Sequence, residues 1–95
     1  MYSKAYWIGC TDGQADALHA HYDAHVKPAV QASDKHVGHH MLEAGENRWL
    51  LISNYHNEES AEAAADMVRE LVTPMMEQFG MTLEVITEGE VVHSF

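Results

Sequence analysis

The stretch "GHHMLEAGENRWLLISNY", residues 38–55, decides the fold of this chain. Two strand-like runs flank the short loop "GEN" (45–47), and a loop containing Gly and Asn between such runs predicts a β-hairpin. The second run places apolar side chains on both of its faces, with Trp49, Leu51 and Tyr55 on one side and Leu50 and Ile52 on the other. Helices cover only one face of a sheet, so we expect the sheet of a symmetric homodimer partner to cover the other.

The segments on either side of the hairpin predict two more strands and the first helix. Aromatic residues and Ile in "YSKAYWIG" (2–9) favour a strand. Thr11 and Gln14 have the spacing of a capping box, which predicts that a helix starts here. Pro28 lacks a backbone donor and predicts a kink or a loosened turn near the end of this helix. The run 82–95 is the last expected strand.

The second helix has recognisable start and stop signals. Asn57 is expected to cap its first turn. Thr73 followed by Pro74 predicts a break, after which a short helix ends at Gly80. Gly89 predicts a bulge or a bend in the last strand.

The predicted order of elements is β-α-β-β-α-β. This is the ferredoxin-like α+β arrangement, in which a four-stranded antiparallel sheet carries both helices on one face. A chain of 95 residues forms one domain, so residues 1–95 are expected to share a single core. Because 46% of the residues are hydrophobic, a further apolar surface is expected to be buried against a partner.

Charge and motif content exclude several classes of partner. Acidic residues outnumber basic ones fifteen to five, for a net charge of −10, so we expect neither nucleic acid nor an anionic membrane surface as a partner. No run reaches the ~20 apolar residues of a membrane span. The stretch "GCTDG" (9–13) is no phosphate-binding loop, and no cofactor is expected. The single Cys10 and the lack of a leader-like segment predict a cytoplasmic location.

Three stretches resemble the dimeric α/β-barrel superfamily, which includes the EthD-like proteins and the antibiotic-biosynthesis monooxygenases. They are "HYDAHVKPAV" (21–30), the hairpin itself and "LVTPMMEQFG" (71–80). In EthD-like proteins the first helix tends to carry an aromatic residue, then a histidine and a proline, matched here by Tyr22, His25 and Pro28. The resemblance implies two sheets packed face to face in a homodimeric barrel, and a small-molecule pocket between the helices and the sheet of each subunit.

The first helix contains three histidines that a regular helical wheel separates. At about 100° per residue, His25 faces inward with Leu18 and Tyr22, His21 borders this arc, and His19 lies towards the acidic side. An inward-facing histidine in a pocket is a candidate acid/base group, and the resemblance implies the same residue. His25 is therefore the predicted catalytic residue, with Tyr22 as its partner. The alternative is a core histidine and a core tyrosine with no chemical role.

Four further residues are predicted to contact a ligand. His21 borders the inward arc, and Met67 belongs to an adaptable methionine-rich lining. Trp49 and Tyr55 share one strand face, where they stack on a planar substrate or pack against the partner subunit. Trp7 has the same two interpretations.

Three functions remain open at this point. The first is an enzyme that acts on a compact apolar, aromatic or lactone-type compound by histidine acid/base chemistry, and the resemblance implies isomerisation or cofactor-free oxygenation. The second is a non-enzymatic homodimer that binds a ligand or acts under stress. The third is a metal- or haem-binding protein, with His21 and His25 as the first ligands and His36, His39, His40 or His56 as a third. We predict no metal, because the chain lacks HExxH, CxxC and any compact carboxylate motif.

Overall fold

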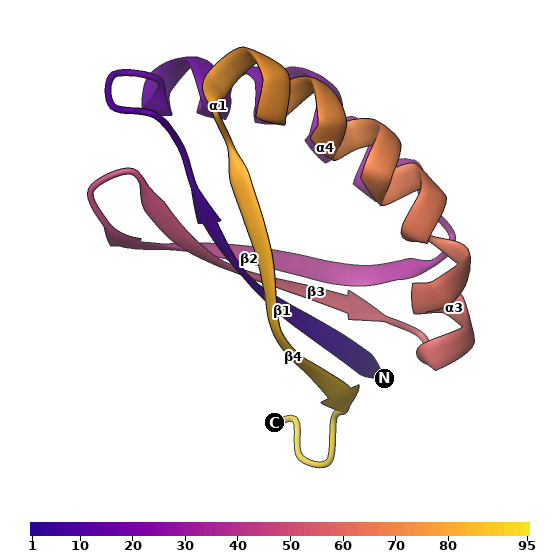
Figure 1. The fold of residues 1–95 in the computed structure, drawn as a ribbon. Helices are drawn as coiled ribbons and strands as arrows, with labels where there is room; N and C mark the ends of the chain where they lie inside the picture. The colour runs from indigo at the N-terminus through magenta and orange to yellow at the C-terminus, as the bar shows by residue number, and fades with distance from the viewer.

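A computed structural model describes residues 1–95 and shows one sheet covered on one face by helices (Figure 1). The strands are β1 (Tyr2–Gly9), β2 (His36–Gly45), β3 (Arg48–Tyr55) and β4 (Thr82–Glu90). The helical segments are α1 (Ala15–His21), the π-helical turn η1 (Tyr22–Val26), α2 (Lys27–Ala32), α3 (Glu58–Ala63) and α4 (Ala65–Phe79). The sheet order is β2-β3-β1-β4 with every pair antiparallel, which confirms the predicted ferredoxin-like arrangement.

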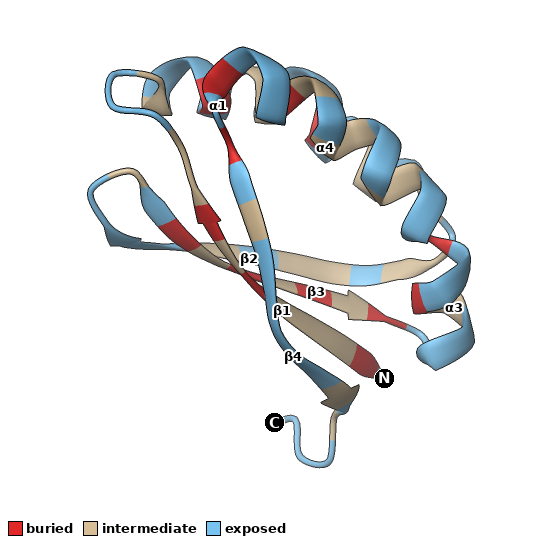
Figure 2. Cartoon of the chain, viewed as in Figure 1, coloured by how far each residue is buried: buried red, intermediate tan, exposed pale blue.

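The two faces of β3 differ as the alternation of its side chains predicts. Trp49, Leu51 and Tyr55 are buried, and the first two join a core cluster with Leu18 of α1 and Met75 of α4. Figure 2 shows buried residues of the strands and of the helices facing one another across this layer. Leu50 and Ile52 point to the opposite face, which no helix covers.

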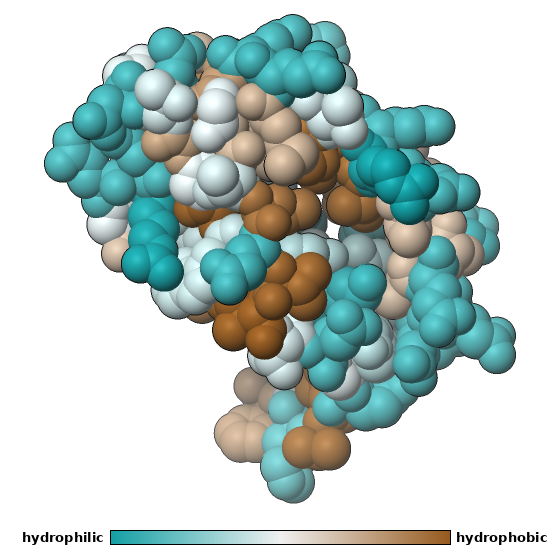
Figure 3. All heavy atoms as spheres, viewed as in Figure 1, coloured by the Kyte–Doolittle hydropathy of each residue, from teal (hydrophilic) through white to brown (hydrophobic).

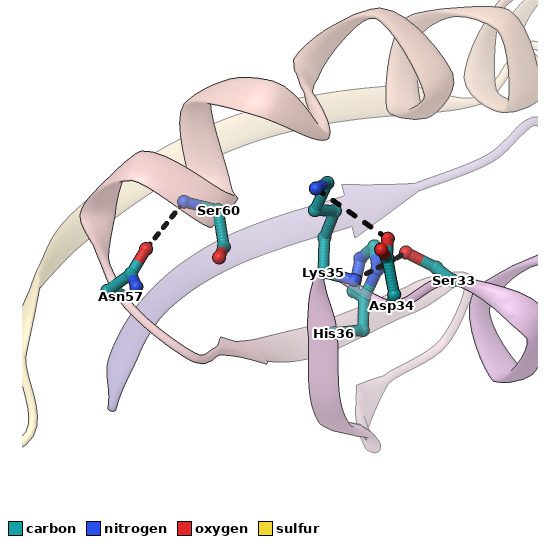
Figure 4. A network of polar contacts seen from close by, with 6 residues as sticks. All are labelled: Ser33, Asp34, Lys35, His36, Asn57 and Ser60. Carbon is teal, nitrogen blue, oxygen red and sulfur yellow. Dashed lines mark hydrogen bonds and ion pairs between the residues drawn. The ribbon is translucent and has the colours of Figure 1, made fainter.

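The two predicted helix starts have different outcomes. The Asn57 side chain accepts a hydrogen bond from the backbone N–H of Ser60 at 2.7 Å, so the predicted cap of α3 is confirmed (Figure 4). The Thr11–Gln14 capping box does not form. Thr11 instead accepts the backbone N–H of Gln14 through its carbonyl oxygen, and α1 begins at Ala15 without a side-chain cap.

The first helical segment widens where Pro28 predicts a loosened turn. The backbone N–H of Lys27 donates to the carbonyl oxygen of Tyr22, five residues back, which is the bond of a π-helix. This turn inserts one residue relative to a regular α-helix. Val26 therefore takes the inward position that a regular wheel assigns to His25, and Val26 is buried while His25 is exposed.

The predicted break at Thr73 and Pro74 is wrong, since α4 runs without interruption to Phe79. The interruption lies earlier, at Ala64, between α3 and α4. Met75 and Phe79, which follow Pro74, are both buried, so their packing holds the last turn against the roughly 3 kcal/mol that an interior proline costs. Gly80 ends the helix as predicted, in the left-handed conformation with φ 60°.

Both edge strands contain β-bulges, although not at the predicted position. Gly89 pairs regularly with Ser3, so the predicted irregularity there is wrong, and β4 ends at Glu90 rather than at residue 95. The register between β1 and β4 shifts further along, which leaves Ile86 as the extra residue. In β2 a similar shift between His36 and Gly38 leaves Val37 as the extra residue.

Two glycines with positive φ provide a matched test of the helix stop. Gly80→Ala places a Cβ against the side chain of Thr11, whereas a Cβ at Gly13 (φ 84°) meets no atom within 4 Å. Gly13→Ala should therefore cost only the backbone strain, about 1 kcal/mol, and Gly80→Ala should cost clearly more. Urea unfolding measures both losses, and equal losses would contradict the steric role of Thr11.

Candidate functional site

An apolar cavity lies between the helices and the covered face of the sheet. Fifteen of its eighteen lining residues are hydrophobic, and its volume is about 50 Å³. Leu18, Tyr22 and Val26 line it from the first helical segment, and α4 contributes Leu71 and Met75. In Figure 3 hydrophobic side chains gather around a hollow between the helix layer and the sheet.

A wider groove of about 450 Å³ adjoins this cavity at the edge of β2. The groove and the cavity have five lining residues in common: Tyr22, Val30, His36, His39 and Met41. These residues therefore form the boundary between the apolar interior and the open groove. Lys27 and Asp23 contribute one charge of each sign to the outer wall.

The boundary carries a chain of hydrogen bonds. The hydroxyl of Tyr22 bonds Nε2 of His39, and Nδ1 of His39 lies 3.2 Å from Oγ of Ser53. Ser53 is the only polar residue among the buried residues, and it pairs with His39 in the register of β2 and β3. Both ring nitrogens of His39 are thus occupied, and its ring orientation is defined from both sides.

The side chains of this chain of bonds are uncharged at neutral pH. Burial, with smaller contributions from His36 and His40, lowers the pKa of His39 to about 4. Burial and the nearby carboxylate of Asp23 raise the pKa of Tyr22 to about 12. The pair therefore acts as a neutral phenol bonded to a neutral imidazole.

A second histidine is positioned beside these bonded groups. Nδ1 of His36 lies 3.0 Å from Oγ of Ser33, and the ring of His36 lies 4.6 Å from that of Tyr55 (Figure 4 shows the Ser33 contact). Burial lowers the pKa of His36 as well. His36 and His39 therefore present two polar groups on the sheet side of the boundary.

The predicted catalytic pair is separated in the structure. Tyr22 lines the cavity, but His25 is exposed and lies outside both the cavity and the groove, so the prediction that His25 faces inward is wrong. The π-turn explains the difference, because the wheel assumed regular α-helix through this segment. The ring of His21 lies 4.6 Å from that of His25 in a tilted arrangement and 5.5 Å from that of Phe79 edge-to-face, also outside the cavity.

The other predicted ligand contacts divide in the same way. Tyr55 lines the cavity, whereas Met67 is half-buried on α4 and does not line it. Trp49 is buried in the core, where its ring lies 5.1 Å from the ring of His19. Trp49 and Tyr55 both lie on the helix-covered face, so the interpretation that they pack against a partner subunit is wrong. Trp7 lies on the uncovered face, where the Arg48 guanidinium stands 4.2 Å from its ring.

From the sequence, His39 was predicted only as one of four candidates for a third metal ligand, and Ser53 was not predicted at all. The signal was present in the hairpin, because Ser53 lies between Leu51 and Tyr55 on the buried face of β3. A hydroxyl on such a face needs a partner, and the opposite strand supplies it. His39 and His40 are neighbours on β2, and the alternation of a strand directs them to opposite faces, where His39 is half-buried and His40 is exposed.

No group of three or more His, Cys, Asp or Glu side chains is placed to hold a metal ion. None of the helices combines the length and the apolar character that a membrane crossing requires.

The fold is shared with several solved structures. No protein-family model and no curated protein sequence matches the chain. A Deinococcus radiodurans protein classed provisionally as an antibiotic biosynthesis monooxygenase has a TM-score of 0.80 and 14% identity over 100% of this chain and 96% of that one. An EthD family protein of Bacillus halodurans has a TM-score of 0.67 and 18% identity over 97% and 100%. A point mutant of MhuD, with two manganese protoporphyrin IX bound per active site, has a TM-score of 0.67 and 22% identity over 100% and 98%.

These similarities confirm that the chain has the ferredoxin-like fold of EthD and antibiotic-biosynthesis-monooxygenase proteins. At these identities the similarity defines the fold and not the chemistry, because one fold hosts unrelated chemistries.

The low pKa of His39 predicts a loss of stability in acid. The unfolded chain binds a proton near the ordinary pKa of 6.5, whereas the folded chain binds it only near 4. Stability should therefore fall as the pH drops from 6.5 to 4, by on the order of 2 kcal/mol after allowance for partial exposure. His39→Gln should reduce this loss in urea unfolding at several pH values. His25→Gln, at an exposed site, is the control and should lose as much stability in acid as the wild type. If His39→Gln also lost as much as the wild type, the assignment to His39 would be refuted.

Proposed function

We propose that this protein binds a compact, mostly apolar small molecule between its helices and its sheet. The observation that carries the proposal is the pairing of an apolar interior with one hydrogen-bonded cluster of polar groups, in which Tyr22 and His39 lie at the boundary and Ser53 is buried behind them. Binding sites for small molecules commonly have this composition, with few polar groups that orient the ligand.

The size of the interior limits how a ligand enters. A dry apolar cavity of roughly 150 Å³ holds a benzene ring, which is three times the present interior. A ring-sized ligand therefore occupies the groove beside β2 and displaces flexible side chains to reach further inward. Met41, Met75 and Met81 line the interior, and methionine adapts readily to such displacement.

A second candidate function is acid/base catalysis at the same boundary, as an isomerase or a cofactor-free oxygenase. The observation that favours it is the half-buried His39, which is neutral at pH 7 and bonded to Tyr22. Its low pKa makes His39 a weak base, however, and a general base works best with a pKa near the working pH. Binding without turnover is therefore the better-supported alternative.

A haem site does not fit the residues of this cavity. The interior of about 50 Å³ is far below the size of a porphyrin, and Tyr22 and His39 are bonded to each other.

We also propose that the uncovered sheet face forms a homodimer with a second copy of the chain. Leu42 on β2 is 51% exposed, and it pairs in register with Leu50 on β3, which in turn pairs with Trp7 on β1. Leu50, Trp7 and Ile52 lie half-buried on the same face. A contiguous apolar face of this kind is typical of an association surface. Packing it against its own copy buries the same residues on both subunits.

Filling the cavity tests the binding proposal. Val72→Phe adds a ring to the wall formed by α4, so it should weaken binding at least tenfold while the chain stays folded. A library of phenols, lactones and aromatic hydrocarbons, screened by thermal shift and followed by calorimetry, supplies the ligands. His25→Ala, outside the cavity, should bind as the wild type does.

Equal affinities in Val72→Phe and in the wild type would contradict the assigned cavity. Chromatography of the same mixtures separates the two functions: unchanged compounds support binding alone, and a product that forms with the wild type supports catalysis.

The dimer is tested by charge placed on the uncovered face. Light scattering of the wild type should give twice the 10.7 kDa mass of the chain, and Leu42→Glu should give a monomer. Met76→Glu is the control, because Met76 is exposed to a similar degree (45%) but lies on α4. A wild-type monomer at micromolar concentration would refute the homodimer.

A further inference from the structure

We infer that His21 and His25 together bind a divalent transition-metal ion of the copper or nickel type at the surface of the first helical segment. The two side chains line neither the cavity nor the groove, so this site is separate from the proposed small-molecule site. The rings form a pair, with centroids 4.6 Å apart and planes inclined by 48°.

The spacing of the two rings fits the coordination of one ion. A metal–nitrogen bond of about 2.0–2.1 Å places the centre of each imidazole about 3.2 Å from the ion, so two rings bound at right angles have centres about 4.5 Å apart. The wider tetrahedral angle of a zinc site would separate the centres by about 5.2 Å. The observed 4.6 Å therefore favours an ion with neighbouring ligands at right angles, and Cu²⁺ and Ni²⁺ have this tetragonal geometry.

The π-turn explains why the two rings stand this close. In a regular α-helix, side chains four residues apart are offset by about 40° around the helix axis. A π-turn closes its hydrogen bond over five residues, so each residue turns the chain less and four residues come nearer to one full circle. This turn, closed by the bond from the Lys27 N–H to the Tyr22 carbonyl, is the segment that joins the two histidines. The insertion that removes His25 from the core thus also aligns it with His21.

Both imidazoles have ring nitrogens available for a metal ion. The side-chain hydrogen bonds of histidine in this structure are those of His36 and His39, and no ion pair involves a histidine. His21 is half-buried with its ring edge-to-face against Phe79, which restricts its orientation before an ion arrives. His25 is exposed and can rotate to present either of its nitrogens.

The chain supplies two ligands to this ion, and water occupies its other positions, since no third His, Cys, Asp or Glu side chain is placed to join the pair. Imidazole nitrogen is a ligand that suits copper and nickel. The net charge of −10 attracts cations to the surface. Because the unfolded chain does not hold the two rings at this distance, binding should stabilise the folded chain.

Titration of the wild-type chain with CuCl₂, in a buffer that does not coordinate metals, tests the site. Calorimetry should show one Cu²⁺ bound most tightly per chain, and the melting temperature should rise with the Cu²⁺ concentration. The visible absorption band of the bound ion should be that of nitrogen coordination. Ni²⁺ and Zn²⁺ should bind more weakly than Cu²⁺, in the general order of affinities.

Single-ligand variants separate the pair from adventitious binding. His21→Gln and His25→Gln should each weaken Cu²⁺ binding at least tenfold, because loss of even an outer-shell partner costs about 10–100-fold in metal affinity. His56→Gln, at another exposed histidine, is the matched control and should bind as the wild type does. Equal affinities in the wild type, His21→Gln and His25→Gln would overturn the inference and leave the proposed function standing.

A shifted pair tests the contribution of the π-turn. Ala24→His combined with His25→Gln places the second imidazole three residues after His21, at an exposed position. A regular α-helix brings residues three and four apart onto one face, whereas the π-turn aligns only the fourth. The shifted variant should therefore bind Cu²⁺ no better than His25→Gln alone, and recovery of the wild-type affinity would overturn this account of the site.

Discussion

Pro28 has no amide proton, and this missing donor determines which side chains of the first helical segment face the ligand cavity. Because Pro28 cannot donate to the preceding turn, the chain closes a wider turn, in which the N–H of Lys27 reaches the carbonyl of Tyr22. The extra residue rotates the side chains at the end of the π-turn about the helix axis. It brings Val26 into the core and turns His25 to solvent, while the Tyr22 hydroxyl still reaches His39.

The features that the sequence predicts well are the local ones. The alternation along residues 48–55 identifies the two faces of β3, Asn57 starts α3, and Gly80 ends α4, because each signal acts within a few residues. The site is harder to predict. The side of the helix on which His25 lies depends on one inserted residue, and the partnership of His39 with Ser53 depends on the register between two strands.

The polar groups at the cavity boundary show how a strongly acidic chain keeps its interior neutral. Tyr22, His39 and Ser53 bond to one another without an ion, and the structure leaves no buried side-chain nitrogen or oxygen without a hydrogen-bond partner. Such a network holds its members in defined orientations, since each lost bond would leave a buried polar group without a hydrogen-bond partner. Orientation at this boundary is thus a property of the sheet and of the π-turn together.

The bulges in β2 and β4 also affect how copies of this chain meet. These are the two edge strands, and the extra residues Val37 and Ile86 interrupt the regular ladder of backbone groups along each edge. Edge-to-edge pairing into extended sheets, the route to aggregation and fibrils, needs long and regular edges. Glu84 adds an exposed negative charge along β4, whereas Glu88 and Glu90 are paired with Lys4 and with the N-terminal amine. The irregular edges therefore discourage open-ended growth, and the sheet face that no helix covers is the one that the proposed homodimer would bury.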